Sequence, residues 1–166
     1  MDKQSTVVLR TSLHAFLLLL ISLLASLCSA QIDTANGSTM VYGTWILKSI
    51  YPTQNVEGPS PAQQKKLIGT TIVLNASTLK ACDQSVPVKT IKVNQVSSAD
   101  FLENNRIRFS EVGVRGASII EIVINQRQSG TCFDAFPLPG QDLYVKNKNE
   151  ILVYFEGAVY RALRKH

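Results

Sequence analysis

Short runs of alternating apolar and polar residues recur from Gly69 to the C-terminus, and this pattern constrains the fold more than any other feature. In residues 106–110, Ile107 and Phe109 share one face and polar residues share the other. Because successive side chains of a strand point to opposite faces, each such run predicts a strand with one buried face. Turn-forming residues separate the runs, so the pattern predicts an antiparallel β-sandwich or β-barrel.

The alternation also predicts where the elements lie. The expected strands span residues 41–50, 70–75, 88–96, 106–110, 118–125, 142–146, 150–156 and 158–164. One short helix is expected after the first strand, because Ser60 is placed to cap it, Pro61 opens it and Gln63 completes a capping box. The polar residues 31–40 are expected to be a flexible lead-in.

The first thirty residues predict a cleavable secretory signal peptide. Lys3 and Arg10 precede an apolar run at 15–27, and small residues precede a cut after Ala30. The run is shorter than the roughly 20 residues that a membrane-spanning helix needs. An uncleaved anchor and a lipoprotein acylated on Cys28 are the alternatives. We therefore expect a secreted or periplasmic protein, without a stable membrane anchor after cleavage, whose residues 41–166 form a single domain.

Two cysteines, Cys82 and Cys132, remain after cleavage. In an oxidising compartment they are expected to form one disulfide bond. A metal site is one alternative, but two thiolates alone make a poor zinc site and the only histidine left is His166 at the C-terminus. A catalytic thiol is the other, but it would need a histidine partner inside the fold. We therefore expect no metal site and no cofactor. Asn36 and Asn75 begin glycosylation sequons, to which the sequence assigns no role.

Charge and motif content narrow the functional classes. Cleavage after Ala30 leaves 15 basic and 11 acidic residues, a formal charge of +4, and the basic residues are scattered. Nucleic-acid binders concentrate such charge on one face, so we expect no nucleic-acid partner. No catalytic triad, phosphate loop or nucleophile elbow is present, and we expect a protein that is not an enzyme. Carboxylate-pair catalysis is the alternative, and its candidate residues are Asp100, Glu103, Glu111, Glu121, Asp134 and Asp142.

The first strand carries Gly43-Thr44-Trp45, and with the strand meander that follows it resembles the calycin superfamily of lipocalin-like and fatty-acid-binding-like barrels. The resemblance implies a meander barrel of about eight strands whose tryptophan plugs one end beneath an arginine of the last strand. That strand offers Arg161 and Arg164, and Asp142-Leu143-Tyr144 loosely matches a late lipocalin turn motif. The chain departs from lipocalins in leaving no room for their C-terminal helix. It departs from fatty-acid-binding proteins in having one helix where they have two.

Alternation in the last strand places Arg161 on the inner face with Val159 and Leu163. Because an unpaired buried charge is costly, we expect Arg161 to stack on Trp45 and close the barrel. Two alternatives are that Arg161 anchors the carboxylate of a ligand, or that the parity is shifted and Arg161 faces solvent.

Two functions remain as hypotheses. The first is a binding protein for a small apolar ligand inside the barrel, with Phe109, Ile122, Phe155 and Arg161 as candidate ligand-binding residues. The same inner face would serve equally as a filled core. The residues expected on it are Trp45, Leu47, Ile72, Leu74, Ile91, Val93, Ile107, Phe109, Ile120, Ile122, Leu143, Val145, Val153 and Phe155.

The second hypothesis is a protein that acts through its surface, for instance as an inhibitor of a secreted hydrolase. The segment 132–140 is stiff and apolar, and Phe133, Phe136 and Leu138 would contact the partner. The alternative is that the two phenylalanines merely close one end of the barrel.

Overall fold

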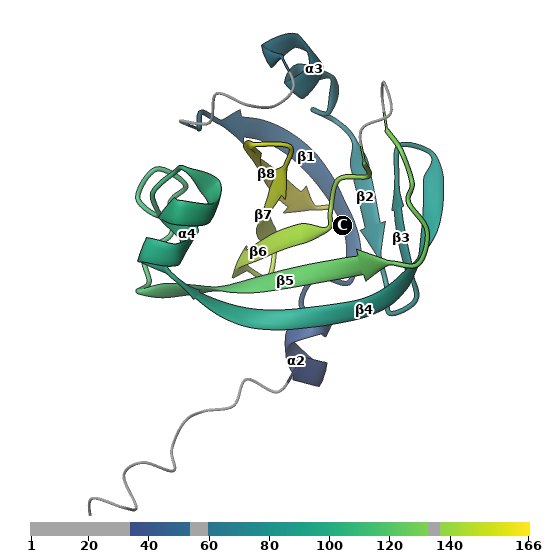
Figure 1. Ribbon diagram of the computed structural model, residues 1–166, viewed down its shortest axis with the longest axis horizontal. Coiled ribbons are helices and arrows are strands. Elements are labelled where there is room, and N and C mark those ends of the chain that lie inside the picture. The colour runs from purple at the N-terminus through teal and green to yellow at the C-terminus, as the bar shows by residue number, and fades with distance from the viewer. Residues whose placement is uncertain (1–33, 54–59, 133–136) are drawn as a thin grey trace, which may run out of the picture. The chain divides into compact units, whose positions relative to one another are not determined.

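Eight antiparallel strands close into a barrel in the computed structural model, which describes residues 34–53, 60–132 and 137–166 (Figure 1). Each strand pairs with the next along the chain, and the last pairs with the first. The predicted all-β antiparallel meander barrel is therefore confirmed. The strands are β1 (Gly43–Tyr51), β2 (Thr71–Leu74), β3 (Thr78–Ala81), β4 (Gln84–Ser97), β5 (Ser118–Gln126), β6 (Asp142–Asn147), β7 (Glu150–Phe155) and β8 (Ala158–Arg164).

All described residues belong to one compact unit, Asp33–His166. The predicted signal peptide, residues 1–30, lies outside the described residues. No helix within the described ranges is long and apolar enough to cross a membrane.

Side chains fill the interior of the barrel. Trp45, Ile122 and Tyr160 are fully buried there, as are most of the predicted inward residues of β1, β2, β6 and β7. An eight-stranded barrel is just wide enough to be filled in this way or to hold one small ligand. The inner face predicted from alternation is therefore largely correct, and it forms a packed core.

Two strand predictions differ from the structure. Residues 106–110 form turns, and Ile107 and Phe109 are buried outside the barrel. The alternation there is real, but it reflects a loop whose apolar side chains pack on the outer face of the sheet. Conversely, β3 was not predicted. It has only four residues, one of them Lys80, and so short a strand shows too little alternation to be recognised.

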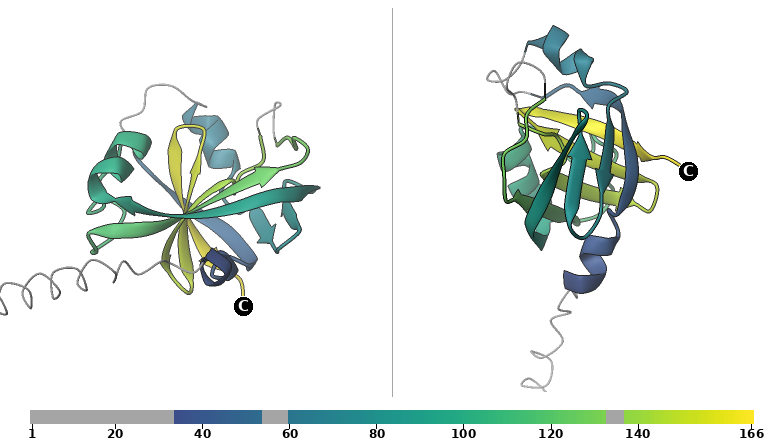
Figure 2. Two further views of the ribbon diagram at one scale, coloured as in Figure 1. Left: turned by 60° about the horizontal axis from the view of Figure 1, so that its bottom comes forward. Right: turned by 90° about the vertical axis from the view of Figure 1, so that its right-hand side faces the viewer.

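Three helices accompany the barrel in the described ranges (Figure 2). The predicted helix is α3 (Pro61–Lys66), whose capping box between Ser60 and Gln63 is present as expected. Helix α2 (Thr34–Thr39) replaces the expected flexible lead-in, and Gly37 lets it approach Val93 closely. Helix α4 (Ser98–Asn105) joins β4 to β5.

The connection between β4 and β5, residues 98–117, builds a second apolar cluster on the outside of the barrel. Phe101 of α4 is fully buried between the rings of Phe109 and Tyr144, whose centroids lie 4.9 and 4.8 Å away. Leu152 and Val159, on the outer face of β7 and β8, are fully buried in the same cluster. This part of the sheet is therefore buried on both faces.

Candidate binding site at the barrel rim

One end of the barrel, here called the closed end, is sealed by Trp45 and Arg164. The Arg164 guanidinium carbon lies 4.1 Å from the centre of the Trp45 ring, a cation–π contact. The guanidinium also donates hydrogen bonds of 2.7 Å to three carbonyl oxygens, those of Met40, Tyr42 and Lys148. Arg164 thus ties the residues before β1 to the β6–β7 turn.

Gly43 makes room for that arginine. Its φ is +125°, and a Cβ at this position would lie 2.6 Å from Nη1 of Arg164. Only glycine adopts such a backbone conformation without strain. The glycine of the Gly43-Thr44-Trp45 motif therefore has a packing role here.

The prediction for Arg161 is wrong, because the parity of β8 is shifted by one residue. Tyr160 and Ala162 point into the barrel, and Arg161 lies on the outside. Its guanidinium donates two hydrogen bonds of 3.1 Å to the carboxylate of Glu150. That pairing lowers the pKa of Glu150. The structural role expected of Arg161 belongs to Arg164, and the solvent-facing alternative for Arg161 holds.

The opposite end, here called the loop end, is closed by the connection between β5 and β6. The predicted disulfide between Cys82 and Cys132 is present and ties this connection to the β3–β4 turn. The Gln84 side chain adds a hydrogen bond of 3.0 Å from the Thr131 amide. Leu138 from the same connection is fully buried in the barrel core. Leu138 therefore acts as a plug for the loop end.

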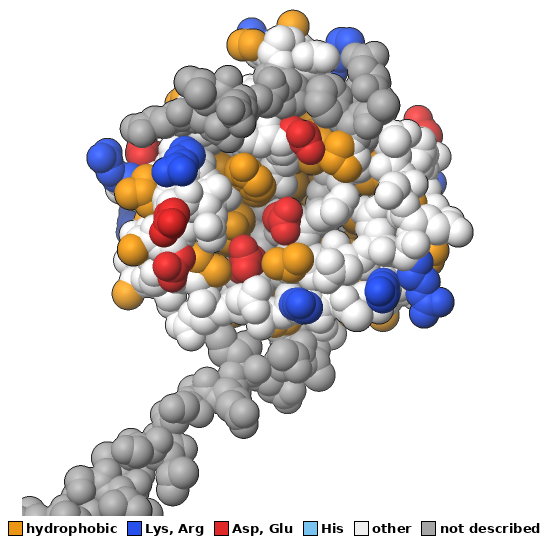
Figure 3. All heavy atoms as spheres, viewed as in Figure 1, with side chains coloured by type: hydrophobic (Ala, Val, Ile, Leu, Met, Phe, Trp, Pro, Cys, Tyr) orange, Lys and Arg blue, Asp and Glu red, His pale blue; other side chains and the backbone are white. Residues whose placement is uncertain are grey.

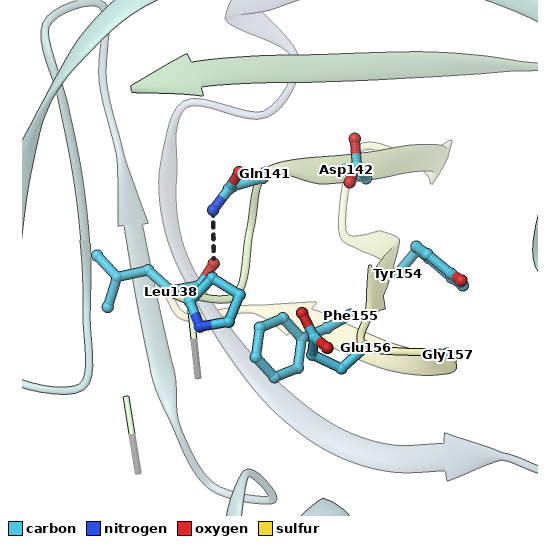
Figure 4. A pocket seen from close by; sticks show the side chains of 8 residues that line it. Leu138, Gln141, Asp142, Tyr154, Phe155, Glu156 and Gly157 are labelled. Atoms are coloured by element: carbon cyan, nitrogen blue, oxygen red, sulfur yellow. Dashed lines mark hydrogen bonds between the residues drawn. The ribbon is translucent and has the colours of Figure 1, made fainter. Parts of the chain in front are cut away.

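A pocket of about 360 Å³ lies beside that plug, at the rim of the barrel (Figure 4). Asp142 is the first residue of β6 and Gln141 directly precedes it, and Tyr154 to Gly157 come from the end of β7 and the β7–β8 turn. We call it the rim pocket, and its lining residues are Pro137, Leu138, Gln141, Asp142, Tyr154, Phe155, Glu156 and Gly157.

Asp142 contributes a half-buried carboxylate to the rim pocket. It is the cross-strand partner of Tyr154 and, on its other side, of Val123. Burial raises the pKa of Asp142, and the nearby Glu121 carboxylate raises it further. Within the described part of the chain, no side chain donates a hydrogen bond to the Asp142 carboxylate, and none forms an ion pair with it.

Glu156 contributes a second carboxylate from an unfavourable backbone position. It is the first residue of the two-residue β7–β8 turn, with a φ of +46°, and Gly157 follows with a φ of +77°. A turn of this type favours Asn-Gly and disfavours a longer side chain at its first position. The half-buried Glu156 side chain has no hydrogen-bond or ion-pair partner among the residues that the structure describes.

The predicted ligand-binding residues are not brought together. Phe155 borders the rim pocket, and Ile122 is fully buried in the barrel interior. Phe109 lies in the outer cluster and Arg161 on the outer surface, so neither faces the interior. The reason is that residues 98–117 cover the outside of the sheet, which gives apolar residues a second place to be buried.

The predicted partner-binding loop is also changed. Leu138 is fully buried, so its side chain is not presented to a partner. Phe133 and Phe136 lie outside the described residues. The surface hypothesis thus loses one of its three contact residues.

Glu156 and Tyr154 were missed as site residues. Their one sequence signal was the Glu156-Gly157 turn, which carries glutamate where asparagine is preferred. Among the carboxylates considered for catalysis, Asp100 accepts a hydrogen bond from its cap residue Ser97, Glu121 accepts one from Asn94, and Asp134 lies outside the described residues. No group of three or more His, Cys, Asp or Glu residues in the described ranges is arranged to hold a metal ion.

Comparison of the chain with protein-family models, with curated proteins and with solved structures finds no match. The closed eight-stranded antiparallel barrel is consistent with a calycin-like fold.

Proposed function

We propose that this chain is an exported, non-enzymatic binding protein that holds a small ligand in the rim pocket. The observation that carries the proposal is the position of this pocket, beside the Leu138 plug of a filled barrel. Ligand sites in β-barrels are commonly found at the end of the barrel, where loops meet a rigid wall of strands. Export is supported by the predicted signal peptide and by the disulfide, which suits an oxidising compartment.

This proposal moves the ligand away from the interior. An apolar ligand inside the barrel would have to displace side chains such as Trp45, Ile122 and Val153, which are fully buried. Displacing well-packed side chains from such a core is costly. The rim pocket needs no such rearrangement, and it offers Phe155 beside polar groups that orient a ligand.

The chemistry of the rim pocket supports binding. Its polar side chains are Gln141, Asp142, Tyr154 and Glu156, and Pro137 and Phe155 supply apolar groups. Polar and apolar groups thus line the pocket together, which suits a small ligand that has both kinds of group.

The test uses the full chain, produced through export so that the disulfide forms. We expect members of a fragment library to shift the backbone amide NMR signals of Gln141, Tyr154 and Gly157. Tyr154→Ala should weaken that binding, whereas Tyr42→Ala at the closed end should leave it unchanged. A fatty acid belongs in the library, because a ligand that shifts only the interior methyl signals of Ile122 and Val153 would contradict the rim site. Shifts confined to other surface regions, or none, would contradict it equally.

A further inference from the structure

The rim pocket concentrates negative charge in a chain that is positively charged overall. Its lining includes Asp142 and Glu156 but no Lys, Arg or His. The whole chain nevertheless carries a formal charge of +5. Figure 3 shows acidic side chains among apolar ones near the centre of one face of the barrel. At physiological ionic strength charges beyond about 8 Å are screened, so the local carboxylates dominate the potential in the pocket.

Among the residues that the structure describes, none neutralises either carboxylate. The described residues supply no ion pair or hydrogen bond to either side chain. The two internal segments outside the description, 54–59 and 133–136, contain no Lys, Arg or His at all. For Asp142, which is half-buried, the lack of a donor makes the ionised form costly, and the cost is relieved when a cation binds.

The remaining lining selects the kind of cation. Tyr154 offers aromatic surface beside the buried Phe155, and Pro137 offers apolar surface. Aromatic faces attract organic ammonium groups through their negative quadrupole. A calcium ion, in contrast, takes six to eight oxygen ligands and has no use for an aromatic side chain, whereas the rim pocket offers two carboxylates beside Tyr154.

We propose that the ligand of the rim pocket is a small organic ammonium compound, whose charged group is held by Asp142 and Glu156 and whose apolar part packs on Tyr154, the cross-strand partner of Asp142. This inference rests on the proposed binding function and adds the chemical class of the ligand. A pocket of about 360 Å³ accommodates an amine that carries one aromatic ring.

The experiment compares three phenyl compounds that differ in their terminal group, which is cationic, neutral or anionic. The full exported chain is titrated with 2-phenylethylammonium, 2-phenylethanol and 3-phenylpropionate, and binding is followed through the amide signals of Gln141 and Gly157. We expect the ammonium compound to bind about tenfold more tightly than the alcohol, and the carboxylate not to bind. Added NaCl should weaken binding of the ammonium compound, because salt screens the attraction.

Two neutralising variants locate the charge. Asp142→Asn should weaken binding of the ammonium compound about tenfold, and Glu156→Asn about threefold to fivefold. Asparagine suits the first position of the β7–β8 turn, so Glu156→Asn should also fold well. The matched controls are Asp83→Asn, an acidic residue with positive φ in the β3–β4 turn, and Glu103→Gln on the exposed side of α4. Both controls should leave binding unchanged.

The outcomes separate the two proposals. If the alcohol binds as tightly as the ammonium compound at the rim, the proposed function stands and the ammonium inference fails. If CaCl₂ shifts the same signals at lower concentration than the ammonium compound, the inference fails as well. If no probe and no library fragment shifts the rim signals, both proposals fail. If Asp83→Asn or Glu103→Gln weakens binding as much as Asp142→Asn does, the attraction is general and the assignment to Asp142 and Glu156 is wrong.

Discussion

At the scale of single residues, two arginines of β8 illustrate how position decides function. Arg164 places its guanidinium over Trp45 and donates to three backbone carbonyls. Arg161, three residues earlier, pairs with one carboxylate at the surface and keeps 39% of its side chain exposed. The rigid guanidinium plane spreads five donors over several directions and stacks on an aromatic ring, whereas an ammonium group is a compact point charge with three donors.

Arg164→Lys should therefore destabilise the fold far more than Arg161→Lys. We expect Arg164→Lys to lower the free energy of unfolding by about 2–3 kcal/mol, because carbonyl oxygens lose donors and Trp45 loses its cover. Arg161→Lys should cost less than about 1 kcal/mol, since exposed ion pairs contribute little. Urea denaturation of both variants measures the difference. Equal losses would show that Arg164 does not hold the closed end together.

The resemblance to the calycin superfamily implied that an arginine of β8 covers Trp45, and alternation along the strand selected the wrong one. Alternation identifies the inner face only where the outer face is polar. In β8 the outer residue Val159 and the inner residue Tyr160 are both fully buried. With both faces apolar, the pattern loses its contrast and the parity cannot be read.

At the scale of elements, the connection between β4 and β5 covers part of the outer face of the sheet and shields it from solvent. Helix α4 begins with Ser97 as its cap, which accepts a hydrogen bond from the Asp100 amide. The Ser97-x-x-Asp100 spacing is a helix-start signal in the sequence, and an apolar residue, Phe101, follows it. Residues 106–110, which follow this helix, alternate like a strand because Ile107 and Phe109 both pack in the outer cluster. The alternation therefore predicted a strand in a connection that contains a helix.

Phe101 is the residue that fixes α4 to the barrel. Phe101→Ala should lower the free energy of unfolding by about 3–5 kcal/mol, because it leaves a cavity between Phe109 and Tyr144. Hydrogen exchange should accelerate first in residues 98–117, since they lose their anchor. Leu102→Ala on the same helix is the control, because Leu102 is 38% exposed and should change stability by less than about 1 kcal/mol. Similar effects of the two variants would mean that α4 is not anchored through Phe101.

At the scale of the whole molecule, the disulfide links the fold to the rim pocket. The bond joins residues 50 positions apart, and it fixes the connection that carries the Leu138 plug and the start of β6. The sequence predicted this bond from the number of cysteines and an antiparallel β fold from strand periodicity, and the resemblance to the calycin superfamily implied that the fold is a barrel. It did not predict the pocket, because the pocket depends on how a loop packs against a turn, which no periodic pattern encodes.

Two carboxylates should give the molecule opposing responses to acid. The pKa of Glu150 is lowered, chiefly by its hydrogen bonds from Arg161, so its stabilising contribution is present above its ordinary value of 4.5 and is lost as the pH falls below it. The pKa of Asp142 is raised, so ionised Asp142 opposes folding at neutral pH. Protonation of Asp142 relieves that cost as the pH falls through the raised pKa, and the relief is complete below its ordinary value of 3.8.

Stability measured against pH in the two neutral variants separates these contributions. At pH 7, Asp142→Asn should stabilise the ligand-free protein, and its advantage should vanish in acid, where wild-type Asp142 is protonated. Glu150→Gln should be less stable than wild type at pH 7 by under about 1 kcal/mol, because its partner Arg161 is partly exposed. This deficit should shrink below pH 4.5. If Asp142→Asn instead destabilises the protein at neutral pH, the Asp142 carboxylate serves folding. If Asp142→Asn stabilises the protein, the Asp142 carboxylate costs stability while the pocket is empty. Binding of a cation beside the carboxylate would offset that cost, which agrees with the proposed ligand.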